Sequence, residues 1–192
     1  MVLGEDKARM SNGALGCTFE TAEYVTQIDG VTYRLWDTAG LNEGKFGTVT
    51  GADAVARIFH LIQKLKDGVH LLVFCIRVPR IHDTAARNYQ IFSDGLCASK
   101  VPTVIIMTGL ENEEPMDEWW EENKTQFTRM GMSFNGHACI TATKGKFKTS
   151  LGAHTFEKEY KESVPRVKKL ISNHCLEEGW KMVSVYESVF FN

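Results

Sequence analysis

Residues 31–40 read Val-Thr-Tyr-Arg-Leu-Trp-Asp-Thr-Ala-Gly. Apolar and polar side chains alternate up to Leu35, and this period of two predicts a β-strand with one face turned to a core. The strand ends at Asp37, whose carboxylate can reach an Mg²⁺ ion, and the backbone N–H of Gly40 can approach a phosphate closely. Asp-Thr-Ala-Gly at a strand end is typical of a nucleotide switch. The alternative is that Asp37 only caps the turn after its strand.

The segments around this strand predict an α/β fold. Residues 18–28 favour a strand, and Asp29-Gly30 is a strong hairpin signal, so the first two strands should pair antiparallel. Residues 69–78 and 101–107 are nearly continuous aliphatic runs, typical of strands buried on both faces. We expect a three-layer, mostly parallel sheet with one antiparallel pair. The remaining expected elements are a strand at 137–141 and helices at 52–65, 82–97, 116–130 and 155–175.

Length and composition favour a single globular domain. The chain has 192 residues, of which 43% are hydrophobic, and a net charge of −2, so no basic excess points to nucleic acid. Its five cysteines form no C-x-x-C pair, which indicates reduced thiols and a cytoplasmic location. The amino terminus lacks a signal-peptide pattern, and the longest apolar run, 69–76, is too short to cross a bilayer. We therefore expect no transmembrane segment.

Polar and glycine-bearing segments follow three of the expected strands. Ligands of α/β sheets bind where parallel strands reach their carboxyl ends, so these segments are the candidate site. They are Asp37-Thr38-Ala39-Gly40, Thr108-Gly109-Leu110-Glu111 and Thr141-Ala142-Thr143-Lys144-Gly145.

In this order and spacing the chain resembles a G domain of the P-loop GTPase superfamily. Trp119-Trp120 and the segment 136–141, Gly-His-Ala-Cys-Ile-Thr, are similar to a fungal set near the septin and immunity-associated GTPases. The resemblance implies GTP or GDP with Mg²⁺ as ligands. It also implies roles for the candidate residues: Thr108 and Glu111 reading guanine, Thr141 to Lys144 bracing the base, Asp37 and Gly40 at the Mg²⁺ and γ-phosphate, and Thr18 ligating Mg²⁺ from the first switch.

The sequence departs from this family in four places. The phosphate loop Gly-x-x-x-x-Gly-Lys-Ser/Thr does not occur, and few residues precede Cys17, so we expect an incomplete G domain without its first strand. Glu111 replaces the family's aspartate, and Gly109 replaces its lysine. Leu41 follows Gly40, where many relatives carry the glutamine that orients water. Hydrolysis should therefore be weak or absent.

The missing strand should leave a gap in the middle of the sheet. It would lie between the strand ending at Asp37 and the strand at 69–78, and two edges with unpaired backbone groups would face each other. The apolar tail, 180–192, is a candidate to fill this gap, although a packed terminal helix or strand is the simpler expectation.

Three functional hypotheses follow. The first is a GTP-binding protein, and the second a pseudo-GTPase without nucleotide that binds a protein partner through the loop 41–51. The third is a hydrolase that uses Cys139 and His137, which share one face of a short strand. Structural explanations also exist for individual groups: a solvated acidic loop around Glu111, packing by Trp119 and Trp120, and a solvated loop for Lys144, Lys146 and Lys148.

Overall fold

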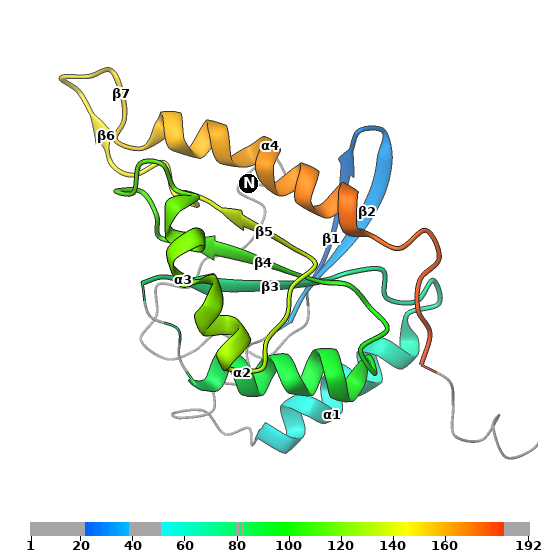
Figure 1. Ribbon diagram of the computed structural model, residues 1–192. Helices are drawn as coiled ribbons and strands as arrows, with labels where there is room; N and C mark the ends of the chain where they lie inside the picture. Colours follow the sequence, from blue (N-terminus) through cyan, green and yellow to red (C-terminus); the bar gives the residue numbers. More distant parts are fainter. Residues whose placement is uncertain (1–21, 39–50, 80, 82, 183–192) are drawn as a thin grey trace, which may run out of the picture.

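The computed structural model describes residues 22–38, 51–79, 81 and 83–182, and its elements are arranged as Figure 1 shows. The expected helix end and loop at 1–16, the loop 41–50 and the tail beyond residue 182 lie outside this part. The elements are β1 (Ala22–Ile28), β2 (Val31–Asp37), α1 (Gly51–Lys64), β3 (Leu72–Arg77), α2 (Asp83–Tyr89), η2 (Gln90–Leu96), β4 (Thr103–Thr108), α3 (Glu118–Arg129), β5 (Gly136–Cys139), β6 (Phe147–Lys148), β7 (Ala153–His154) and α4 (Glu157–His174).

The hairpin predicted around Asp29-Gly30 is confirmed. Strands β1 and β2 pair antiparallel with Ile28 opposite Val31. Both turn residues have positive φ, 51° and 81°, which is the conformation that lets a two-residue turn match the twist of its strands.

The centre of the fold is a parallel sheet in the order β3-β4-β5. Helices lie on both of its sides, with α4 on one side and α1, α2 and α3 on the other (Figure 1). Side chains of β4 and β5 alternate between the two layers. Ile105, Met107 and Cys139 pack with the aromatic residues of α2 and α3, whereas Val104, Ile106 and Ala138 pack with the apolar face of α4. The mixed α/β class is thus as predicted.

The prediction of two strands buried on both faces holds for one strand only. From Thr103 to Met107 the side chains of β4 are buried, but β3 alternates between partly buried and exposed residues. Phe74 and Ile76 face the aromatic layer, while Val73 is 39% exposed. The reason is that α4 packs over β4 and β5 and does not cover the outer face of β3.

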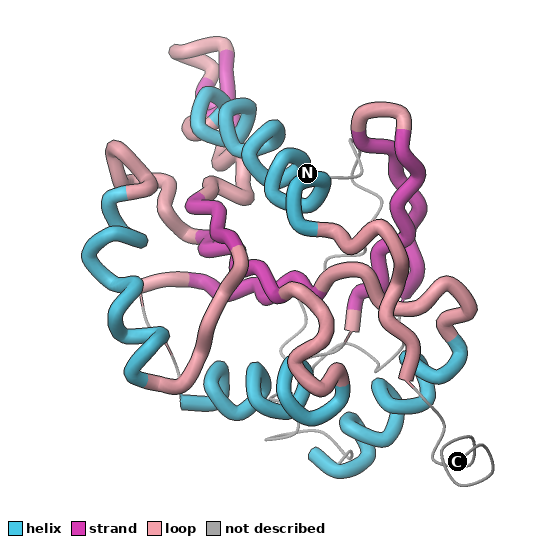
Figure 2. Tube along the Cα trace, turned by 45° about the vertical axis from the view of Figure 1, so that its right-hand side comes forward, coloured by secondary structure: helices cyan, strands magenta, loops and turns pink. Residues whose placement is uncertain are grey.

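The antiparallel pair and the parallel sheet are separate sheets. No strand hydrogen bonds join β2 to β3 within the described residues, so the two sheets are separate at the point where the missing strand was expected to leave a gap (Figure 2). An isolated antiparallel bridge joins Val69 to Trp180, with backbone N–O distances of 2.8 and 2.9 Å. Trp180 and Met182 also pack against the buried cluster of Ile62, Cys97 and Val101. The start of the apolar tail is therefore packed just before β3, and residues 183–192 lie outside the described part.

Two further segments differ from the expectation. The helix predicted at 82–97 is a short α-helix, α2, that continues as the π-helix η2. Residues expected as a solvated loop form the small antiparallel hairpin β6–β7. In the described ranges we find no helix that combines the length and apolar character needed to cross a membrane.

Candidate functional site

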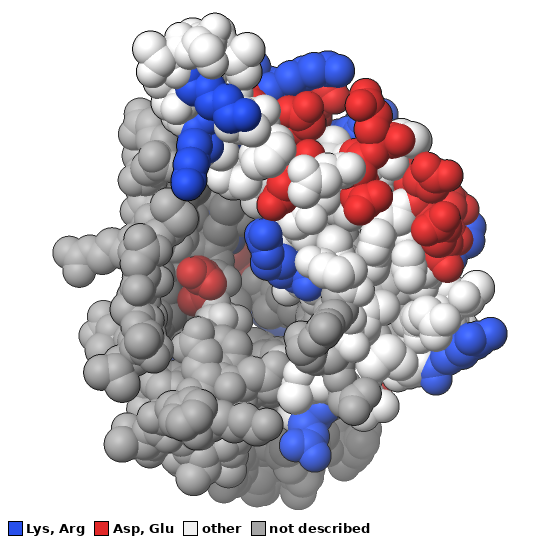
Figure 3. Space-filling view, turned by 90° about the vertical axis from the view of Figure 1, so that its left-hand side faces the viewer, with Lys and Arg blue, Asp and Glu red and all other residues white. Residues whose placement is uncertain are grey.

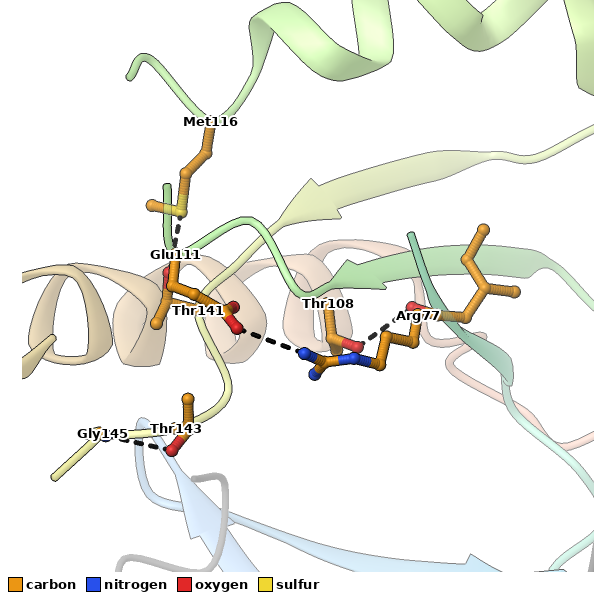
Figure 4. A network of polar contacts seen from close by, with 8 residues as sticks. Arg77, Thr108, Glu111, Met116, Thr141, Thr143 and Gly145 are labelled. Atoms are coloured by element: carbon orange, nitrogen blue, oxygen red, sulfur yellow. Dashed lines mark hydrogen bonds and ion pairs between the residues drawn. The ribbon is translucent and has the colours of Figure 1, made fainter. Parts of the chain in front are cut away.

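The carboxyl ends of β3, β4 and β5 meet at one edge of the parallel sheet, shown in Figure 4. Arg77 is in register with Thr108, and Met107 with Cys139, so the three strands end at nearly the same level. The segments 108–111 and 141–144, named from the sequence as candidate site residues, therefore leave adjacent strands on the same edge.

The turn after β4 depends on Gly109. Its φ is +88°, a backbone conformation that favours glycine, and a Cβ there would lie 3.2 Å from both Arg77 Cγ and the Val78 carbonyl oxygen. The next residue, Leu110, is 1% exposed and packs in the core beside Met107. A side chain at position 109 would therefore be strained.

Arg77 supplies a positive charge at this turn. Its Nη2 donates to Glu111 Oε1 at 3.2 Å, and the guanidinium crosses from β3 to reach the carboxylate (Figure 4). Sequence reasoning missed Arg77. The sequence shows a basic residue at the end of an apolar strand. Its pairing with Thr108 depends on strand register, which one sequence does not reveal.

The two oxygens of Glu111 differ in environment. The side chain of Glu111 is only 13% exposed, whereas that of Arg77 is 69% exposed. Oε2 of Glu111 is buried and has no hydrogen-bond partner within the described ranges. Buried polar atoms are nearly always paired, and an unpaired one costs about 1–3 kcal/mol. Glu111 is therefore a carboxylate with unused hydrogen-bonding capacity at the strand-end edge.

Thr108 has a structural bond at the same edge. Its hydroxyl donates to the Ile76 carbonyl at 3.2 Å and ties the end of β4 to the end of β3. This bond keeps the turn that carries Glu111 in a fixed place relative to Arg77.

The segment after β5 begins with the fully buried Thr141. Its backbone N–H donates to Ser163 Oγ at 2.9 Å, and the Ser163 hydroxyl donates in turn to the Glu159 carbonyl within α4 at 2.6 Å. The Thr141 hydroxyl contacts Met116 Sδ at 3.4 Å, ahead of α3. Thr141 is thus held by α4 and by the segment ahead of α3.

The following residues turn outward from this anchor. Ala142, Thr143 and Lys144 are exposed. Thr143 Oγ1 accepts a hydrogen bond from the Gly145 backbone N–H at 3.0 Å, which shapes the turn (Figure 4). The Nζ of Lys144 lies 5.4 Å from the centre of the Tyr160 ring. Small and polar side chains therefore form the outer wall of the edge.

Asp37 lies at the end of β2, in the other sheet, and is exposed. Cys75 on β3 is partly open to solvent, but protein atoms crowd around its thiol and displace water from it. This desolvation raises the pKa of the thiol to about 11, and the charge of Asp37 contributes less. The end of β2 is therefore near β3. Thr38 is partly buried, while Thr18, Ala39 and Gly40 lie outside the described residues.

Of the two expected Mg²⁺ ligands, Thr18 and Asp37, the described part of the chain includes Asp37. The described ranges contain no group of three or more His, Cys, Asp or Glu side chains that could hold a metal ion. In the P-loop GTPases that the sequence resembles, Mg²⁺ is held jointly by a few protein ligands and the nucleotide phosphates. A cluster of several carboxylates is therefore not required. The exposed carboxylate of Asp37 fits that role chemically.

The pair Cys139 and His137 is unsuited to nucleophilic catalysis. Cys139 is fully buried, and this burial, with a smaller effect of Asp117, raises the pKa of its thiol to about 12. His137 stacks on Trp120 with ring centres 4.5 Å apart, and partial burial lowers its pKa. A protonated thiol in the core is a poor nucleophile, so the structural explanation of both residues is favoured.

The chain matches none of the protein-family models, and no curated protein matches it. The case for a function therefore rests on the strand-end edge.

Proposed function

We propose that the edge formed by β4 and β5 binds the base of a guanine nucleotide, with hydrolysis weak or absent. The observation that carries this proposal is Glu111: a largely buried carboxylate at the strand-end edge with one oxygen lacking a hydrogen-bond partner among the described residues. The segment 141–144 lies on the adjacent strand end, where it would brace the other side of the base.

The chemistry of guanine matches this group. Its Watson–Crick edge presents two adjacent N–H donors, and an ionised carboxylate is an acceptor with two oxygens that can take both. Adenine lacks that pair of donors. The structural requirement is that Glu111 turns its free oxygen outward and that its other oxygen leaves Arg77. Arg77 is largely exposed, so its departure costs little, about 1 kcal/mol or less.

Glu111 and the segment 141–144 would select the base, and the residues around Asp37 and Gly40 would contact Mg²⁺ and the phosphates. Asp37 would hold Mg²⁺ with Thr18, and Gly40 would approach the terminal phosphate. The 192 residues contain no Gly-x-x-x-x-Gly-Lys-Ser/Thr motif, which is the usual source of phosphate affinity. We therefore expect selective but weak binding, and slow or no turnover because Leu41 cannot orient water.

A titration of this chain with fluorescent GDP and GTP, with and without Mg²⁺, tests the proposal against an adenine nucleotide. Glu111→Gln keeps the size of the side chain but removes its charge, and should weaken guanine binding by about 10- to 100-fold, as expected for losing charge-assisted hydrogen bonds. Glu113→Gln is the matched control, because Glu113 is an exposed acid in the same turn. Equal binding of adenine and guanine nucleotides would overturn base recognition by Glu111.

The second candidate is a pseudo-GTPase that acts as a protein-interaction module. The observation in its favour is that Glu111 already has Arg77 on one oxygen, while its other oxygen is enclosed by protein. In this case the ion pair is a permanent part of the turn, and the loop 41–51 would contact the partner. Absence of guanine binding at roughly millimolar nucleotide, near the weakest affinity of interest, would favour it.

A further inference from the structure

The hairpin β6–β7 projects from the body of the protein ahead of α4 (Figures 1 and 2). Phe147 is in register with His154, and Lys148 with Ala153. Further backbone bonds close the tip and the base, from Leu151 N–H to Lys148 O at 3.0 Å and from Phe156 N–H to Lys144 O at 2.9 Å. The hairpin therefore has a defined shape of its own away from the sheet.

Two large apolar side chains lie on this hairpin in contact with solvent. Leu151 is 67% exposed and Phe147 59% exposed, more than any other large hydrophobic side chain in the described ranges. Phe147 contacts the ring of His154 edge-on, with centres 5.4 Å apart, and is otherwise open. Two exposed apolar side chains on one small projection make it the most apolar exposed element among the described residues.

The charge of the hairpin is positive although the whole chain is slightly negative. Residues 142–156 contain three lysines and no Asp or Glu, against a net charge of −2 for the chain. Lys146 and Lys148 are exposed and take part in no ion pair within the described part of the chain. The acid that follows, Glu157, is paired with Lys161 at 2.7 Å. In Figure 3 basic atoms gather on this projection, at the top of the view, and acidic atoms cover the neighbouring body.

We propose that this hairpin docks the protein on an anionic lipid bilayer. Phe147 and Leu151 would enter the boundary between headgroups and acyl chains, and Lys144, Lys146 and Lys148 would lie at the level of the lipid phosphates. Lysine suits that position because its apolar stem can follow the two side chains while its ammonium group stays with the headgroups.

The size of the surface favours a bilayer over a protein partner. A stable protein interface buries about 800 Å² on each side and has a packed apolar centre. Two apolar side chains on a hairpin with two residues in each strand fall well short of that. A bilayer requires no matching pocket and combines apolar insertion with attraction of nearby lysines.

Flotation of the protein with lipid vesicles tests this inference. We expect the unchanged chain to float with vesicles of phosphatidylcholine and phosphatidylserine and to stay behind with phosphatidylcholine alone. The double variant Lys146→Gln, Lys148→Gln should partition about thirty-fold more weakly, since each lysine near an anionic surface contributes about a factor of five. Phe147→Ser with Leu151→Ser should reduce binding at least about tenfold through lost apolar burial. Added salt should weaken the binding.

Matched controls separate the hairpin from general properties of the chain. Lys66→Gln with Lys100→Gln changes the net charge equally at two exposed lysines outside the hairpin. Val25→Ser with Val31→Ser removes two side chains that are 58% and 56% exposed on β1 and β2. Both control pairs should float as the unchanged chain does. No flotation of the unchanged chain on anionic vesicles, or equal flotation of the hairpin variants, would overturn the inference. Guanine binding is measured separately and does not enter this test.

Discussion

Arg77 and Glu111 form an ion pair of 3.2 Å that passes over Gly109, the residue that the turn after β4 needs. The Arg77 side chain fills the space where a Cβ of residue 109 would lie, with its Cγ 3.2 Å and its Cζ 3.4 Å from that position. The absence of a side chain at position 109 therefore leaves room for Arg77 of β3 to reach Glu111.

Gly109→Ala should therefore destabilise the protein by about 2 kcal/mol, since it adds both backbone strain at positive φ and a contact with the fixed Val78 carbonyl. Urea unfolding measures the change. Gly152→Ala is the control, because its φ of +60° is similarly unfavourable but nothing lies within 4 Å of its Cβ position. It should cost about 1 kcal/mol. Equal costs for both variants would show that the space over Gly109 is not restricted.

Arg77→Ala should have opposite effects on stability and on guanine binding. Arg77 is the ion-pair partner of a Glu111 side chain that is only 13% exposed, so its removal should lower the free energy of unfolding by about 1–3 kcal/mol. The same variant frees the Glu111 carboxylate from its competitor, so guanine affinity should rise up to about fivefold. Denaturant unfolding and the fluorescent nucleotide titration measure the two quantities. Weaker guanine binding by this variant would mean that Arg77 contacts the base rather than competing with it.

Ser163→Ala should destabilise the wall formed by residues 141–144. The Ser163 hydroxyl is fully buried and accepts from the Thr141 N–H, so its removal leaves a buried donor unpaired at about 1–3 kcal/mol. Ser172→Ala removes a partly buried hydroxyl from the same helix, whose bond to the Lys169 carbonyl is 3.3 Å long, and should change stability by less than about 0.5 kcal/mol. Thermal unfolding of both variants checks the difference, and a cost at Ser172 equal to that at Ser163 would contradict it.

Sequence patterns predicted the elements whose signals are local. The turn at Asp29-Gly30 and the buried run of β4 each contain their own evidence, in turn residues and in continuous apolar character. The equally apolar β3 was predicted to be buried on both faces, and that was wrong because the buried cluster beneath α4 includes residues of β4 and β5 but none of β3. Coverage by another element is a property of the tertiary structure and leaves no mark on the strand itself.

The candidate site was predictable only to the level of its strand ends. Placing Thr108 to Glu111 and Thr141 to Lys144 on one edge follows from parallel topology. The role of Arg77 depends on strand register and on the conformation of Gly109, neither of which one sequence specifies. The hairpin β6–β7 has two residues in each strand, too few to produce a period.

The stacked pair of His137 and Trp120 should make stability depend on pH near the histidine pKa. Partial burial lowers the pKa of His137 below its usual 6.5, against the opposing charges of Asp117 and Glu121. The unfolded chain therefore binds a proton more readily than the folded one between these two pKa values. The stabilising contribution is fully present above pH 6.5, is lost as pH falls towards the folded pKa, and changes no further below it.

An NMR titration of the His137 ring, together with unfolding curves at several pH values, checks this prediction. The ring should titrate below pH 6.5. His137→Phe preserves an aromatic ring beside Trp120 without a titrating group, so the unchanged chain should lose stability relative to this variant as the solution becomes more acidic. A ring that titrates above its usual pKa would mean that the carboxylates of Asp117 and Glu121, rather than burial against Trp120, control the protonation of His137.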